Sequence, residues 1–156
     1  MLRLLEDKEA ACLIYSGEKL LHSSQSIGVK PLLEFMEKYP NGYEKEDLLL
    51  IDKVIGKAAL LLSVLLGMKT IHTPVASRAA VEAAKAHGVT LYAETVVPYI
   101  MNREKNGICP LEKSVLNTTD PQEALQNIRE AIRILMAEKK ISKSFSAQEP
   151  APDFHQ

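Results

Sequence analysis

The fold is decided by residues 47–93, DLLLIDKVIGKAALLLSVLLGMKTIHTPVASRAAVEAAKAHGVTLYA, in which short apolar runs alternate with helical patterns. The run at 47–51 is apolar throughout after its aspartate, which is typical of a strand buried on both faces. From about residue 52 to residue 66 the sequence is rich in helix formers, and Gly67 suits the position after a helix end. The stretch therefore predicts a strand followed by a buried helix.

The same alternation continues through the rest of this stretch. Residues 69–74 predict a strand, residues 77–87 a helix that is capped by Ser77 and ended by Gly88, and residues 89–93 a third strand. Because strands joined through helices usually lie parallel, we predict a βαβαβ sheet with helices packed on it. A ligand would bind at the carboxyl edge of such a sheet.

The residues before this stretch add an antiparallel edge to the sheet. Two short runs at 11–15 and 20–24 flank a turn that contains Gly17, which predicts a hairpin. A helix over 29–38 follows, with Pro31 in its first turn.

The residues after this stretch are less regular. Residues 110–116 predict a short helix, and Asp120-Pro121 introduces a longer helix that we expect to run to about Lys140. We expect one domain over residues 1–140 and a disordered tail over residues 141–156.

Length and charge exclude several classes of protein. A chain of 156 residues is the size of one domain. Its formal charge of -1 gives no general attraction to nucleic acid, and the longest apolar run, 54–68, contains Lys57 and is shorter than the roughly 20 residues that cross a bilayer. We expect neither a nucleic-acid partner nor a membrane partner.

The two cysteines, Cys12 and Cys109, are too few for a disulfide framework. The charged residues at 6–9 follow the amino terminus too closely for a signal peptide. We therefore expect a cytoplasmic protein with reduced thiols, in which Cys12 belongs to the core.

Four residues at the predicted junction of strand and helix form the first candidate site: Asp52, Lys53, Gly56 and Lys57. On a helix the two lysines would share one face, and the free amides at the helix start would bind phosphate or carboxylate. The alternative is structural: Asp52 caps the helix and pairs with a lysine, and Gly56 permits close packing.

Cys109 and Glu112 form the second candidate site. The thiol precedes a short predicted helix, where it would be a nucleophile or redox group, and Glu112 would move a proton or act as a cap. The alternative is that Cys109 is an ordinary packed thiol.

The order of predicted elements and two motifs resemble a known family. The motifs are DKVIGKAA at 52–59 and the pair VPYIxNR at 97–103 and CPxE at 109–112. They are similar to the uncharacterised bacterial family called domain of unknown function 1893, over roughly residues 5–130. The family is placed in the cytidine deaminase-like superfamily, which implies a three-layer α/β fold with a mixed central sheet of about five strands and helices on both faces.

The resemblance also implies where the site lies. Asn102 and Arg103 belong to the family pattern, and Arg103 would clamp a carboxylate or phosphate. Ser26 and Gly28 are weaker candidates, because the superfamily's site lies at the start of the helix that follows them.

The zinc chemistry of that superfamily is not expected. Its enzymes hold zinc through His or Cys at the starts of two helices, and a Glu moves protons on the bound water. The corresponding segments here, 26–31 and 52–57, contain no His, Cys or Glu. We expect no metal and no cofactor.

Three functions remain open. The first is binding of a small anionic metabolite or nucleotide, with Lys57 and Arg103 on the anion and Asp52 positioning a donor group. The second is an enzyme of nucleotide or small-molecule metabolism that depends on Cys109. The third is an oligomeric interaction module in which the apolar helix at 58–66 is covered by a second subunit.

Overall fold

A mixed sheet of six strands forms the centre of the protein in a computed structural model that describes residues 1–43, 47–102 and 104–148. The strands follow the order β2-β1-β3-β5-β4, and β6 pairs with the other side of β5. Their bounds are β1 Cys12–Ser16, β2 Lys19–Ser24, β3 Leu48–Asp52, β4 Val54–Ile55, β5 Met68–Ser77 and β6 Thr90–Val97.

The predicted topology of the sheet is confirmed. Strand β3 is parallel to β5, and β5 is parallel to β6, so the βαβαβ unit forms as expected. The hairpin of β1 and β2 joins the other side of β3, where β1 runs antiparallel. The mixed α/β class therefore follows from the strand order.

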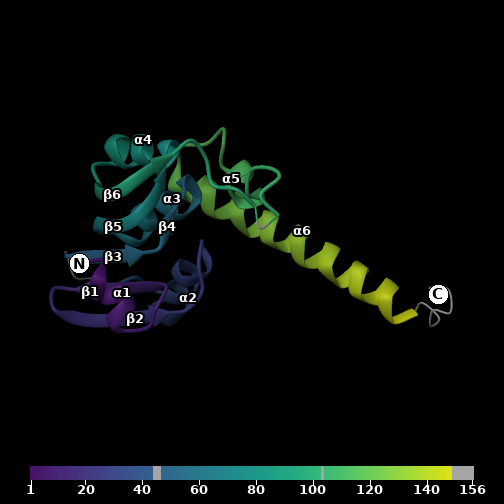
Figure 1. Cartoon of the computed structure of the whole chain (residues 1–156), viewed down its shortest axis with the longest axis horizontal. Helices are drawn as coiled ribbons and strands as arrows, with labels where there is room; N and C mark the ends of the chain where they lie inside the picture. Colours follow the sequence, from purple (N-terminus) through teal and green to yellow (C-terminus); the bar gives the residue numbers. More distant parts are fainter. Residues whose placement is uncertain (44–46, 103, 149–156) are drawn as a thin grey trace.

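Six helices accompany this sheet in the described part of the chain (Figure 1). Their bounds are α1 Arg3–Asp7, α2 Lys30–Lys38, α3 Lys57–Leu66, α4 Arg78–His87, α5 Pro110–Ser114 and α6 Pro121–Gln148. The expected helix ends are confirmed: the Ser77 hydroxyl accepts a hydrogen bond from the Ala80 amide at 3.1 Å, and Gly67 has a φ of 87°.

Two apolar clusters hold helices against the sheet. The larger one joins alternate residues of β1 and β3, including Ile14 and Leu50, to residues of α2, α3, α4 and α6. The smaller one joins Leu5 of α1 to Leu13 and Ile51. Because successive residues of a strand face opposite sides, β1 and β3 carry packed helices on both faces.

The apolar helix α3 is covered by its own chain. Leu60, Leu61 and Leu62 are fully buried within the larger cluster. The last residues of the helix, 64–66, are half-buried.

Three elements differ from the sequence-based expectation. Helix α1 was not predicted, and β4 occupies residues that were assigned to the start of the following helix. Helix α6 continues to Gln148, so residues 141–148 are helical where a disordered tail was predicted. The end of that predicted tail, 149–156, lies outside the described residues.

No helix within the described ranges is both long enough and apolar enough to span a bilayer.

Candidate functional site

The amino end of α3 binds a carboxylate that belongs to the protein itself. The backbone amides of Lys57 and Ala58 donate hydrogen bonds of 2.8 and 2.9 Å to the two side-chain oxygens of Glu112. Glu112 comes from α5, far along the chain, and is 9% exposed. A helix start with free amides attracts an anion, and Glu112 is that anion here.

Gly56 makes room for this contact. Its φ of -97° is available to any residue, so the glycine is not required by the backbone. A methyl group at Gly56 would instead overlap the three atoms of the Glu112 carboxylate. Burial raises the pKa of Glu112 above its ordinary value, and the two amides and the charge of Lys57 offset part of that rise.

The two lysines of the predicted anion site do not face one ligand. Strand β4 separates Lys53 from α3, so the helical spacing that would align Lys53 with Lys57 is absent. Lys53 lines a surface cavity of about 410 Å³ together with Glu6 and Glu9. The half-buried Lys57 donates from its ammonium to the Leu116 carbonyl at 3.3 Å.

Asp52 lies at the carboxyl end of β3 and is not the cap of α3. Gly56 holds the capping position. In the sheet, Asp52 pairs with Cys12 of β1, and Cys12 pairs with Ser24 of β2. These three residues, which we call the strand-end row, are all buried.

The carboxyl group of Asp52 has no hydrogen-bond partner although it is 0% exposed. The neighbouring amide of Lys53 donates to the Ala11 carbonyl at 3.1 Å. Burial raises the pKa of Asp52 to about 8, although the backbone amides of Lys53 and Val54 partly lower it; these amides lie near the carboxyl group without the geometry of a hydrogen bond. Asp52 is therefore largely protonated at neutral pH, with an unused donor and an unused acceptor.

Cys12, the middle residue of the strand-end row, is also fully buried. Burial raises the pKa of the Cys12 thiol well above its usual range, and the carboxyls of Asp52 and Glu34 raise it further. Cys12 is thus a neutral thiol in the core, as its place in a strand predicted.

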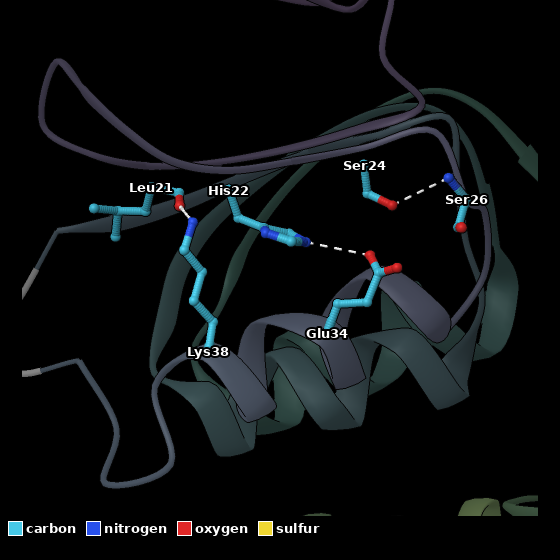
Figure 2. Close-up of polar contacts among 6 residues, drawn as sticks. All are labelled: Leu21, His22, Ser24, Ser26, Glu34 and Lys38. Carbon is cyan, nitrogen blue, oxygen red and sulfur yellow. Dashed lines mark hydrogen bonds and ion pairs between the residues drawn. The ribbon is translucent and has the colours of Figure 1, made fainter.

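A second polar group lies between β2 and α2 (Figure 2). Nε2 of His22 and Oε1 of Glu34 are 3.3 Å apart, and the Ser24 hydroxyl accepts a hydrogen bond from the Ser26 amide at 3.1 Å. Burial raises the pKa of Glu34, but the hydroxyl of Ser24, His22 and the charge of Lys30 bring it below its ordinary value.

Sequence reasoning missed His22, Ser24 and Glu34 as members of one group. His22 and Ser24 alternate on β2, so a period of two places them on one side of the hairpin, opposite Ile14 and Cys12. That alternation was the available signal. The contact with Glu34 depends on how α2 packs, which the pattern does not contain.

The remaining predicted residues are spread around this region. Cys109 lies half-buried at the start of α5, and its amide donates to the Ile100 carbonyl at 3.0 Å. Asn102 binds Asn106 at the tip of the same loop, with 2.8 Å between Nδ2 and Oδ1. Arg103 lies outside the described residues.

Ser26 and Gly28 lie in the turn before α2. Ser26 is half-buried and contacts Ser24 through its amide, whereas Gly28 has a φ of 75°. This left-handed conformation explains the glycine.

The residues present do not fit the zinc ion of a deaminase. In the described part of the chain, no three His, Cys, Asp or Glu side chains are grouped so that they could hold a metal. Asp52 and Cys12 are side by side, but the ligands that the superfamily supplies from its helix starts are absent.

Comparisons with known proteins place these features in a family of unknown activity. A family model described as "Domain of unknown function (DUF1893)" matches residues 1–132. The chain is also similar to the crystal structure of a DUF1893 family protein from Thermotoga maritima, at 29% identity and a TM-score of 0.68, over 88% of this chain and 86% of that one. No curated protein matches. The family match contains Asp52 and Glu112 and ends within α6.

Proposed function

The chain belongs to the DUF1893 family, whose description names no activity, and we propose from its geometry that it binds a small polar metabolite or nucleotide through Asp52. The ligand would present a hydrogen-bond donor, such as a base amine, to the carboxyl group. The proposal rests on one observation, the fully buried Asp52 carboxyl without a partner.

A buried polar group without a partner costs free energy, on the order of 1–3 kcal/mol. Such groups are rare in folded proteins, and each calls for a specific explanation. Glu112 demonstrates that this chain satisfies a buried carboxylate with two amides where the role is structural. A ligand that completes the hydrogen bonds of Asp52 would explain why no backbone amides bind Asp52 as two of them bind Glu112.

The position of Asp52 supports a cytidine deaminase-like shell. Asp52 precedes α3, and Ser24, at the other end of the strand-end row beyond Cys12, precedes α2. The resemblance implies a site at these two helix starts. We propose that the shell is kept for binding and works without a resident metal.

The anionic part of the ligand would be neutralised by Lys57. The α3 amides are engaged by Glu112, and Lys53 lines a surface cavity that does not include Asp52. Lys57 is half-buried, and its ammonium makes one hydrogen bond of 3.3 Å, to the Leu116 carbonyl, so we propose this lysine as the cation for the anionic group. We therefore expect a ligand with one anionic group and not a polyphosphate.

An enzyme that depends on Cys109 and Glu112 is a weaker proposal. Both side-chain oxygens of Glu112 accept amide hydrogen bonds from α3. Because both oxygens are bound to the backbone, Glu112 has a structural role and is poorly placed to carry a proton.

Isothermal titration calorimetry with cytidine, cytidine monophosphate and inorganic phosphate tests the binding proposal. We expect the monophosphate to bind with a Kd below about 1 mM, and Asp52→Asn to weaken its binding at least roughly tenfold. Lys57→Ala should weaken the monophosphate but not cytidine. Glu94→Gln, an exposed acidic position on β6, is the control.

Two results would contradict the proposal. One is the absence of binding of either nucleoside probe, and the other is equal affinity in Asp52→Asn and the native chain. The zinc-to-protein ratio of untagged protein purified without chelator is a separate check: a ratio near zero is expected, and a ratio near one would restore hydrolytic deamination as the leading function.

A further inference from the structure

The carboxyl-terminal part of α6, residues 133–141, forms an exposed arm. Every residue of this arm is exposed, including four large apolar ones: Ile134 at 45%, Leu135 at 37%, Met136 at 65% and Ile141 at 60%. Figure 1 shows the helix extending away from the sheet and the other helices. A single helix of this length gains little stability in water without a packing partner.

The arm carries an apolar stripe that differs from the one packed on the rest of the protein. Ala124 and Ile128 are fully buried in the core and define the inner side of α6. At about 100° per residue, Ile134, Ala137 and Ile141 lie roughly 120–180° around the helix from Ile128. The stripe of the arm therefore faces away from the packed side and is free to meet another chain.

The spacing of this stripe is that of a coiled coil. Ile134, Ala137 and Ile141 are separated by three and then four residues, which matches the a, d and a positions of a heptad. A β-branched residue at position a favours two strands in coiled coils that have Leu at d, and here the smaller Ala137 stands at d.

Charges beside the stripe select the direction of pairing. Arg133 and Lys140 occupy g positions, and Glu138 occupies an e position. In a parallel pair, g of one helix lies beside e of the other, so Arg133 meets Glu138 of the second copy. In an antiparallel pair, the g positions face each other and bring Arg133 and Lys140 together.

We propose that the arm joins two copies of this chain through a short parallel coiled coil. The seam consists of Ile134, Ala137 and Ile141, and pairs of Arg133 with Glu138 flank it on both sides. The exposed pair of Arg133 with Glu130 in the same helix is exchanged for this contact. The arm lies beyond the residues that match the family, so the proposal is independent of the binding site.

Sedimentation equilibrium of the full chain, from about 10 µM to about 1 mM, measures this association. A dimer fraction that rises with concentration is expected. Changing both Ile134→Glu and Ile141→Glu should raise the dissociation constant at least roughly tenfold, because two like charges replace each apolar contact. Met136→Glu is the control, since it adds one such charge at an exposed position outside the seam.

The direction of the pair is tested by charge reversal. Arg133→Glu alone should weaken a parallel dimer, and Arg133→Glu together with Glu138→Arg should restore it. Stronger association of Arg133→Glu would indicate antiparallel helices and overturn the proposed geometry. A monomer at about 1 mM, or a dimer that the two isoleucine substitutions leave unchanged, would overturn the proposal itself.

Discussion

Asp52 at the end of β3 and Glu112 at the start of α3 are two buried carboxyl groups, and only Glu112 has hydrogen-bond partners. Glu112 accepts amide hydrogen bonds of 2.8 and 2.9 Å, whereas both oxygens of Asp52 have none. Burial raises the pKa of both groups. The difference separates a buried carboxylate whose hydrogen bonds are satisfied from one whose hydrogen bonds are not.

The largest expected effect tests the structural member of this pair. Gly56→Ala places a methyl group where the Glu112 carboxylate lies, and should expel it from the two amides of α3. Overpacking together with two orphaned donors should lower the free energy of unfolding by roughly 4–6 kcal/mol. Urea denaturation measures this loss.

The same substitution in a Glu112→Ala background provides the control. The amides are already orphaned there and the overlap is gone, so adding Gly56→Ala should cost less than about 1 kcal/mol. Equal costs in the two backgrounds would mean that Glu112 is not the group that needs the glycine.

The next largest effect is a gain in stability, expected on substitution of Asp52. With a pKa of about 8 in the folded state, Asp52 stays protonated while the unfolded chain ionises above about pH 4. Unfolding then releases a proton, so stability falls as pH rises from about 4 to about 8. Asp52→Asn should remove this slope and stabilise the protein at pH 8 by roughly 2–4 kcal/mol.

Thermal unfolding at pH 5 and at pH 8 measures this gain. Glu94→Gln, which changes an exposed acidic side chain on β6, is the control. A loss of stability in Asp52→Asn at pH 8 would show that the ionised carboxylate has partners in the fold.

A smaller effect is expected for Glu112→Gln. The amide oxygen can still accept one hydrogen bond from α3, but the side-chain nitrogen faces the other backbone donor. The resulting loss should be about 1–3 kcal/mol in urea denaturation, below that of Gly56→Ala. A variant as stable as the native chain would contradict the capping role.

The smallest effect is expected at Glu34, which is 34% exposed beside His22. Its pKa is lowered in the folded state, so its contribution is present above the unfolded pKa and lost as pH falls. Glu34→Gln should cost less than about 0.5 kcal/mol at pH 7. A loss like that of Glu112→Gln would place Glu34 among the structural carboxylates.

The strands and helices of residues 47–93 could be predicted because their signals are local. Ser77, Gly67 and Gly88 mark helix ends at the residues where the structure has them. Strand β4 could not be told from the helix start, since a pair of apolar residues fits both patterns.

The contacts at the start of α3 were not predicted from the sequence. The sequence favoured an external anion there, whereas the structure has the carboxylate of Glu112, which also lies against Gly56. The sequence did not show that the anion is Glu112, because that contact joins residues far apart in the chain and depends on the packing of α5. The lack of a hydrogen-bond partner for the Asp52 carboxyl group likewise depends on which residues the sheet places beside it.

Carbon-13 NMR of the side-chain carboxyl groups, followed from pH 3 to pH 9 in the ligand-free protein, tests the contrast between Asp52 and Glu112 most directly. We predict that Asp52 titrates near pH 8, as expected for a buried group without hydrogen-bond partners. An Asp52 that titrates near pH 4 would show that its carboxylate is solvated or paired, and would contradict the central claim.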